Sequence, residues 1–292
     1  PYSQEEFDNL RIKTLIKMGH KHEAIRVLNN ISTYEAYKNY YDQIKLDSYF
    51  ATYALSEACN FKDSLEEFNE NKNNIFLKVS IFCSFLENKP EEADLLNALL
   101  LDTNDKDEYF QKIYFNLKKD INDPIIITQG NFEESLFSLY SAMIRIGSLP
   151  FTKQFLDFDS TNLTLPIILS SSTEISLRLI SAHRAYELGL FKAESLSALY
   201  QSVDFSKEEL NNWENTLDNF TQKPELGMAL LFQNARVQLL PITRLETLKE
   251  FWNYAIIHDL ENLAYDVSRN LIELTEPSIE LSDYSILISR AH

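Results

Sequence analysis

Scarcity of glycine constrains the fold of this chain more than any other feature of its sequence. Only 5 of its 292 residues are glycine, where average usage of about 7% would give roughly twenty. Sheet-rich and doubly wound α/β proteins need glycine at tight turns and in phosphate-binding loops, where the backbone adopts conformations that other residues avoid. Helices joined by short connections have no such need, so the composition predicts an all-α protein.

Apolar residues recur at helical spacing through most of the chain. One stripe runs from Ile75 to Leu86, and another runs from Ile175 to Leu188 and would end at Gly189. Ser206 and Glu209 have the spacing of a capping box and predict a helix start. Prolines and glycines fall between such stripes and indicate about a dozen helices of about 10 to 16 residues. Short loops between helices, without strands, predict antiparallel neighbours.

Two segments lack the helical pattern. Residues 125–127 are three isoleucines close to Pro124, which predicts a short extended piece or a loop against the core. Residues 157–169 contain Ser, Thr and Asn and are expected to form a longer connection. We place the seam of the chain near the isoleucines. The expected parts are N-terminal helical repeats over residues 1–122 and C-terminal helical repeats over residues 131–292 that continue the same stack.

The formal net charge of −17 limits the partners that the chain can bind. An acidic surface repels nucleic-acid phosphates and anionic lipid head groups, and no basic cluster offsets it, so we expect no binding to nucleic acid. The acidity serves solubility or attracts a basic partner surface. No apolar run reaches the roughly 18 residues that a membrane-spanning helix needs, and we expect no transmembrane segment.

The segment from Gly19 to Ile25 has the form of a turn between two packed helices. Gly19 would end the first helix, and Ala24, five residues on, would let the helices approach closely. Glu-Ala pairs at residues 23–24, 57–58 and 92–93 recur at intervals of 34 and 35 residues, although the pair at residues 35–36 falls outside this period. Chance also produces such pairs, because Glu and Ala are strong helix formers. The N-terminal third resembles a degenerate tetratricopeptide repeat, whose period is about 34 residues. The resemblance implies an α-solenoid of antiparallel helical hairpins.

A second pattern extends over more of the chain. It consists of Ala58-Cys59, Lys78 to Cys83, Glu92-Ala93 to Leu100, Arg145 to Gly147 with Pro150, Arg178 to Gly189, and Leu196 to Tyr200. In order and spacing these residues resemble an uncharacterised group of helical-repeat proteins from alphaproteobacterial cell envelopes. The resemblance implies a periplasmic or envelope-associated scaffold and carries no activity with it. A cytoplasmic location is the alternative.

Cys59 and Cys83 are the only cysteines, and each lies on the apolar stripe of its predicted helix. With one helix between theirs, the two helices of a solenoid would run parallel and touch, which makes a disulfide geometrically feasible. The bond would stabilise the fold by roughly 3 kcal/mol and would indicate an oxidising compartment. The alternative is a pair of buried thiols that act as small hydrophobic groups. Two thiolates without further ligands nearby do not make a zinc site.

Motifs that carry chemistry are missing from the sequence. No phosphate-binding loop, dinucleotide fingerprint or nucleophile elbow occurs. His22-Glu23 begins like a zinc-protease motif, but Arg26 stands where the second histidine would be. Glu194-Ser195 matches the Glu-Ser of soluble lytic transglycosylases, but the Gly-Leu-Met-Gln stretch that should follow is absent, so the pair is better explained as a helix start. We expect no enzymatic activity, no cofactor and no metal.

Four tyrosines form one stripe at helical spacing: Tyr34, Tyr37, Tyr40 and Tyr41. They form either core or part of a partner-binding groove, because tyrosine buries a large area and keeps a polar hydroxyl. The sequence therefore favours a non-catalytic helical-repeat scaffold whose partner is a protein or peptide. The alternatives are a structural subunit of a larger envelope assembly and a non-catalytic accessory domain of a peptidoglycan-active system.

Overall fold

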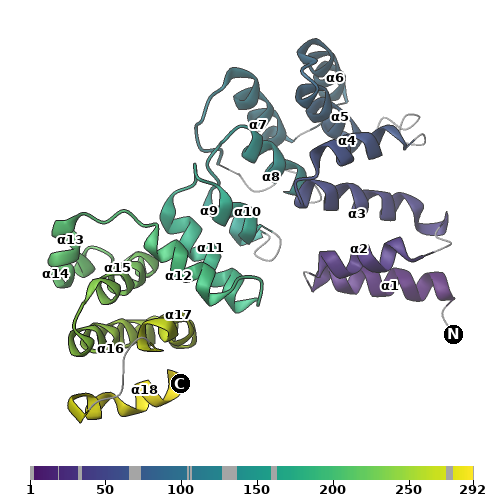
Figure 1. Cartoon of the computed structure of the whole chain (residues 1–292). Coiled ribbons are helices and arrows are strands. Elements are labelled where there is room, and N and C mark those ends of the chain that lie inside the picture. Colours follow the sequence, from purple (N-terminus) through teal and green to yellow (C-terminus); the bar gives the residue numbers. More distant parts are fainter. Residues whose placement is uncertain are drawn as a thin grey trace. The chain divides into compact units, whose positions relative to one another are not determined.

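The structure is a computed structural model that describes residues 3–18, 20–31, 35–65, 74–103, 105, 107–126, 137–158, 163–273 and 279–291. Within these ranges all regular structure is helical and no residue lies in a strand, which confirms the all-α fold class (Figure 1). The chain divides into two units. Unit 1 comprises Pro1–Pro166 with Ser170–Ser172, and unit 2 comprises Ile167–Leu169 with Thr173–His292.

Unit 1 is a succession of helices in which most neighbours in the chain also pack in space. Contacts join α1 to α2, α2 to α3, α3 to α4, α4 to α5, and α5 to α6, while α8 packs on both α3 and α7. The helices are α1 (Gln4–Lys17), α2 (Lys21–Asn29), η1 (Glu35–Tyr37), α3 (Lys38–Ala51), α4 (Leu55–Asp63), α5 (Asn74–Leu86), α6 (Pro90–Asp102), α7 (Glu108–Lys119), α8 (Phe137–Ile146) and α9 (Lys153–Phe158), and α10 (Thr164–Leu169) carries the boundary between the units.

Local sequence explains where several helices of unit 1 begin. Ser3 and Glu6 form a reciprocal capping box at the start of α1, which satisfies two backbone donors that no helical carbonyl reaches. Pro90 occupies the first turn of α6, where its missing N–H costs nothing. Asp107 caps α7 by accepting from the Phe110 N–H. In α5 every residue from Leu77 to Ser84 is buried, so this helix is surrounded by the rest of the unit.

Unit 2 is built around α15. This helix contacts α11, α12, α13, α14, α16 and α17, and ten of its 14 residues are buried. Gly227 lies where the Tyr254 ring of α16 crosses α15, and a side chain at this position would overlap that ring. The helices are α11 (Ile175–Glu187), α12 (Ala193–Gln201), α13 (Lys207–Asn211), α14 (Trp213–Asp218), α15 (Pro224–Val237), α16 (Pro241–Ile257), α17 (Glu261–Glu273), η4 (Ile279–Tyr284) and α18 (Ser285–Ala291).

The division of the chain differs from the expected parts at residues 1–122 and 131–292. The boundary lies further along the chain, near Pro166, because α8 packs on α3 and α7 and so belongs to unit 1. Arg145 of α8 also lies over the Tyr53 ring, 3.8 Å from its centroid. Of the three isoleucines near the expected seam, Ile125 is buried and Ile126 is exposed, in a segment without regular structure. Residue 127 lies outside the described residues.

The expected long connection over residues 157–169 is partly wrong. Thr164–Leu169 forms α10, and residues 159–162 lie outside the described part of the chain. Ile167 and Ile168 are buried, which gives this short helix an apolar face. Pro166 falls within its first turn, where a backbone N–H has no helical partner, so the proline does not prevent the helix.

Candidate functional site

A groove of about 570 Å³ lies between α1 and α2. The two helices pack tightly because Ala24 is fully buried at their interface with Ile12, as expected for the small residue of the hairpin. Gly19, the other residue of that prediction, lies outside the described residues. The groove is lined by Gln4, Glu5, Asp8, Arg11, Leu15, Glu23, Arg26, Val27, Asn30 and Ile31.

Charges of both signs line this groove. Glu5, Asp8 and Glu23 are half-buried, whereas Arg11 and Arg26 are exposed at its edges. Asp8 accepts a hydrogen bond of 3.0 Å from the Gln4 amide, and Glu23 lies 3.8 Å from the His20 ring. Neither arginine has an ion pair among the described residues. The charged side chains of the groove are therefore only weakly neutralised within the described residues, and they can form ion pairs with a ligand.

The predicted tyrosine stripe lies beside this hairpin. Tyr41 is 1% exposed and packs with Ile12 and Ala24, so it belongs to the core. Tyr37 and Tyr40 are partly buried, and each ring centroid is 5.9 Å from that of Tyr41. Tyr34 lies outside the described residues. Only Tyr37 and Tyr40 therefore offer described surface to a partner.

Electrostatics connect the tyrosines to the groove. Burial raises the pKa of Tyr41 most, and the Asp8 and Glu5 carboxylates raise it further. Burial also raises the pKa of Tyr40. The ammonium of Lys13 lies over the Tyr40 ring, 5.2 Å from its centroid. Tyr40 and Tyr41 therefore stay neutral at physiological pH, and the Asp8 and Glu5 carboxylates of the groove act on the Tyr41 hydroxyl.

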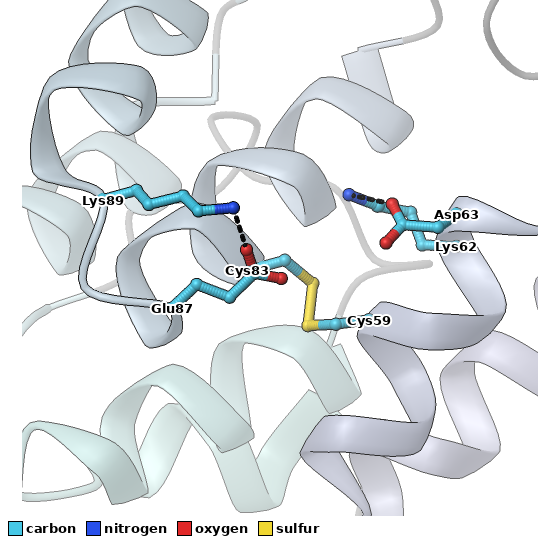
Figure 2. The surroundings of a disulfide bond; sticks show 6 residues. All are labelled: Cys59, Lys62, Asp63, Cys83, Glu87 and Lys89. Atoms are coloured by element: carbon cyan, nitrogen blue, oxygen red, sulfur yellow. Dashed lines mark hydrogen bonds and ion pairs between the residues drawn. A yellow bond between two sulfur atoms is a disulfide. The ribbon is translucent and has the colours of Figure 1, made fainter.

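A disulfide joins Cys59 of α4 to Cys83 of α5 (Figure 2). Both cysteines are buried, at 6% and 1% exposure, and no described cysteine is free. The expectation of one helix between theirs is not met, because α4 and α5 follow one another among the described helices and pack together. Figure 2 also shows two ion pairs near the bond: Lys62 with Asp63 at 2.7 Å, and Lys89 with Glu87 at 2.6 Å.

A buried charge network in unit 1 was not predicted from the sequence. The ammonium of Lys78 is 1% exposed and donates to Asp107 at 2.7 Å, and it lies 3.0 Å from Asp105. Asp107 also accepts hydrogen bonds from the Phe110 N–H and the Tyr140 hydroxyl. The network ties α5 to α7 and α8. A lysine within residues 75–83, where every other residue except Ser80 is apolar, was the signal that could have revealed it.

Buried polar groups in unit 2 also form pairs. The His183 ring nitrogen lies 2.7 Å from the Tyr200 hydroxyl, and burial lowers the pKa of His183 to about 4. Ser176 donates to Glu225, which is 4% exposed. Burial, and then the Glu225 carboxylate, raise the pKa of Tyr200. These groups are buried in the core that α11, α12 and α15 share, where each polar side chain has a hydrogen-bonding partner.

Residues considered for chemistry lie apart from one another. Glu194 and Ser195 are exposed in the first turn of α12, as expected for a helix start. His20 precedes α2, and His22 lies in its first turn. Over the described ranges no group of three or more His, Cys, Asp or Glu side chains is placed to hold a metal ion.

These observations define a two-unit, all-helical protein with one disulfide and a charged groove in its first hairpin. No described helix is both long and apolar enough to cross a membrane. Comparison with protein-family models, curated proteins and solved structures found no match.

Proposed function

We propose that this chain is a non-catalytic helical scaffold that holds a segment of a protein or peptide partner in the groove between α1 and α2. The observation that carries the proposal is the combination of apolar side chains, from Leu15, Val27 and Ile31, with charged side chains of both signs that are only weakly neutralised within the described residues. Such a surface fits a polypeptide, which supplies apolar side chains and both signs of charge. The proposal includes no enzymatic activity and no nucleic-acid partner.

Two finer features belong to the same proposal. The first is that the hairpins form a tetratricopeptide-like solenoid, which the tight α1–α2 packing at Ala24 supports. The second is an oxidising location, in the periplasm or associated with the cell envelope, with the cytoplasm as the alternative. The disulfide between Cys59 and Cys83 supports the oxidising location, because such bonds persist outside the cytosol.

Site-specific cross-linking tests the proposed binding groove. A photoreactive amino acid in place of Asn30 lies in the groove, whereas the same amino acid in place of Lys249, on α16 of unit 2, is also exposed and serves as the control. In an extract of the native source we expect partner adducts from position 30 and not from position 249. Equal labelling at both positions, or none at position 30, contradicts the proposal.

A second candidate function is a structural subunit of a larger envelope assembly. An apolar tip, defined as Val237, Leu239, Leu240 and Ile242, joins α15 to α16, and these side chains are 59%, 90%, 65% and 42% exposed. Contiguous exposed apolar residues often mark a protein contact. If the tip holds an assembly together, Leu239→Asp reduces the native-source particle to the monomer mass. The control Ile257→Asp, at the other end of α16, leaves the particle intact. A wild-type monomer excludes this function.

A further inference from the structure

We infer that the groove between α1 and α2 selects an extended peptide in which an acidic residue stands between two basic ones. The inference rests on the proposed function and adds the chemistry of the partner. It follows from the order of charges along the groove, from their state of pairing, and from the spacing that helix geometry imposes.

The order of charges follows from the antiparallel hairpin. Because a short connection joins Lys17 to Lys21, α1 and α2 run in opposite directions, and the start of α1 lies level with the end of α2 (Figure 1). Glu5 and Asp8 therefore share one end of the groove with Asn30 and Ile31. Arg11 shares the middle with Arg26 and Val27, and Glu23 shares the far end with Leu15. Along its length the groove is acidic, basic and acidic.

The pairing state points to a ligand at the middle of the groove. Arg11 and Arg26 line the same part of it, and neither has an ion pair in the described part of the chain. Two guanidinium groups that lie close together repel each other, and a carboxylate placed between them would accept charge-assisted hydrogen bonds from both. The ends of the groove would bind Lys or Arg side chains of the ligand in the same way, through the carboxylates of Glu5 and Asp8 at one end and of Glu23 at the other.

Helix geometry sets the spacing of the ligand charges. Glu5 and Asp8 precede Arg11 by six and three residues, which is about 9 and 4.5 Å along the helix axis. Leu15, level with Glu23, follows Arg11 by four residues, or about 6 Å. An extended peptide advances about 3.3 Å per residue. The basic residues therefore stand one to three positions from the central acidic one on the side of Glu5 and Asp8, and about two positions from it on the side of Glu23.

A matched set of labelled heptapeptides tests this pattern by fluorescence anisotropy with the full chain. The patterned peptide is Thr-Lys-Thr-Glu-Thr-Lys-Thr, and the control Thr-Glu-Thr-Lys-Thr-Lys-Thr has the same composition and net charge in another order. We expect the patterned peptide to bind at least tenfold more tightly, which corresponds to one charge-assisted contact of about 1.4 kcal/mol. The general attraction of an acidic protein for a cationic peptide is equal for both peptides.

Charge reversal in the protein gives the complementary test. We expect Arg11→Glu to weaken binding of the patterned peptide at least tenfold and to bind a variant peptide with a central Lys more tightly than the wild-type chain does. Arg11 is exposed at the edge of the groove, so the substitution is compatible with folding. Lys249→Glu makes the same change of charge in unit 2 and is expected to leave both affinities unchanged.

The outcomes separate this inference from the proposed function. If the two heptapeptides bind equally, or if Arg11→Glu does not reverse the preference, the charge pattern is wrong while peptide binding stands. If neither peptide binds but position 30 still cross-links a partner, the pattern is again overturned and the groove holds a segment of other chemistry. If peptide binding and cross-linking both fail, the proposed function falls with the inference.

Discussion

Reduction of the Cys59–Cys83 disulfide is expected to lower the stability of unit 1 by about 3.5 kcal/mol. The two cysteines are 24 residues apart in the sequence. Cross-linking a loop of this length removes about 12 cal/mol/K of conformational entropy from the unfolded chain, which is about 3.5 kcal/mol at 25 °C. Because both sulfur atoms are buried among apolar groups, the two thiols formed on reduction fit the same space as small hydrophobic groups.

Two probes distinguish the units during denaturation. Trp213 and Trp252 both belong to unit 2, so tryptophan fluorescence reports that unit. Amide hydrogen exchange in α4 and α5 reports unit 1 at the disulfide itself. We expect reductant to lower exchange protection of α4 and α5 by a factor of several hundred, which corresponds to about 3.5 kcal/mol. The fluorescence midpoint is expected to move less.

A double variant provides the control for the chemistry of the reductant. Cys59→Ala with Cys83→Ala contains no thiol, so its stability is expected to be the same with and without reductant and to lie near or below that of the reduced wild type. A loss below about 0.5 kcal/mol on reduction of the wild type would refute the idea that the bond stabilises unit 1 by restricting its unfolded chain. Two free thiols in native-source protein, measured by mass spectrometry without reductant, would favour the cytoplasmic alternative.

Three further perturbations address the interior of the two units. Lys78→Met leaves the buried Asp107 and the partly buried Asp105 carboxylates without their ammonium and is expected to cost about 3 to 5 kcal/mol in urea denaturation. Lys118→Met breaks a half-exposed pair with Asp94 and is expected to cost under about 1 kcal/mol. Because the folded-state pKa of His183 is about 4 and its unfolded value is 6.5, the unfolded chain binds the proton first as the pH falls. Stability is expected to decline between pH 6.5 and 4 by up to about 3 kcal/mol, and His183→Gln removes this component of the pH dependence of tryptophan-monitored unfolding; identical pH profiles would contradict it. Gly227→Ala is expected to cost about 1 to 3 kcal/mol by overlap with the Tyr254 ring, and the same loss in a Tyr254→Ala background would contradict that cause.

Local signals in the sequence predicted the local structure well. The capping box of Ser206 and Glu209 begins α13, and Pro90 begins α6. Gly189, with a φ of 70°, follows the end of α11, where a left-handed residue is needed and glycine costs least. Such features depend on a few neighbouring residues, so they can be read from the sequence alone. The stripe after Ser206 is interrupted at Asn212 into α13 and α14, a detail that periodicity did not indicate.

Features that depend on contacts between distant residues were harder to predict. The packing of α8 on α3 moves the boundary between the units, and nothing in the sequence near residue 122 reveals that contact. The sequence left open whether the two cysteines form a disulfide or remain buried thiols, because the answer depends on how their helices pack. The tyrosine stripe was predicted as core or as part of a partner-binding groove, but no described tyrosine lines the groove between α1 and α2, and the charged side chains that line it were not predicted. Glu5, Asp8 and Arg11 share one helix face at three-residue intervals, and only the position of α2 turns that face into a groove.

The disulfide between α4 and α5 also connects residues 59 and 83 by a second covalent path, in addition to the backbone between them. A protease that cuts once between Cys59 and Cys83 would produce two fragments that remain bonded through sulfur. The nicked protein would keep its full mass on a non-reducing gel and would separate into two bands only after reduction. In an oxidising compartment, a single cut between Cys59 and Cys83 would therefore break the backbone of unit 1 without releasing either fragment.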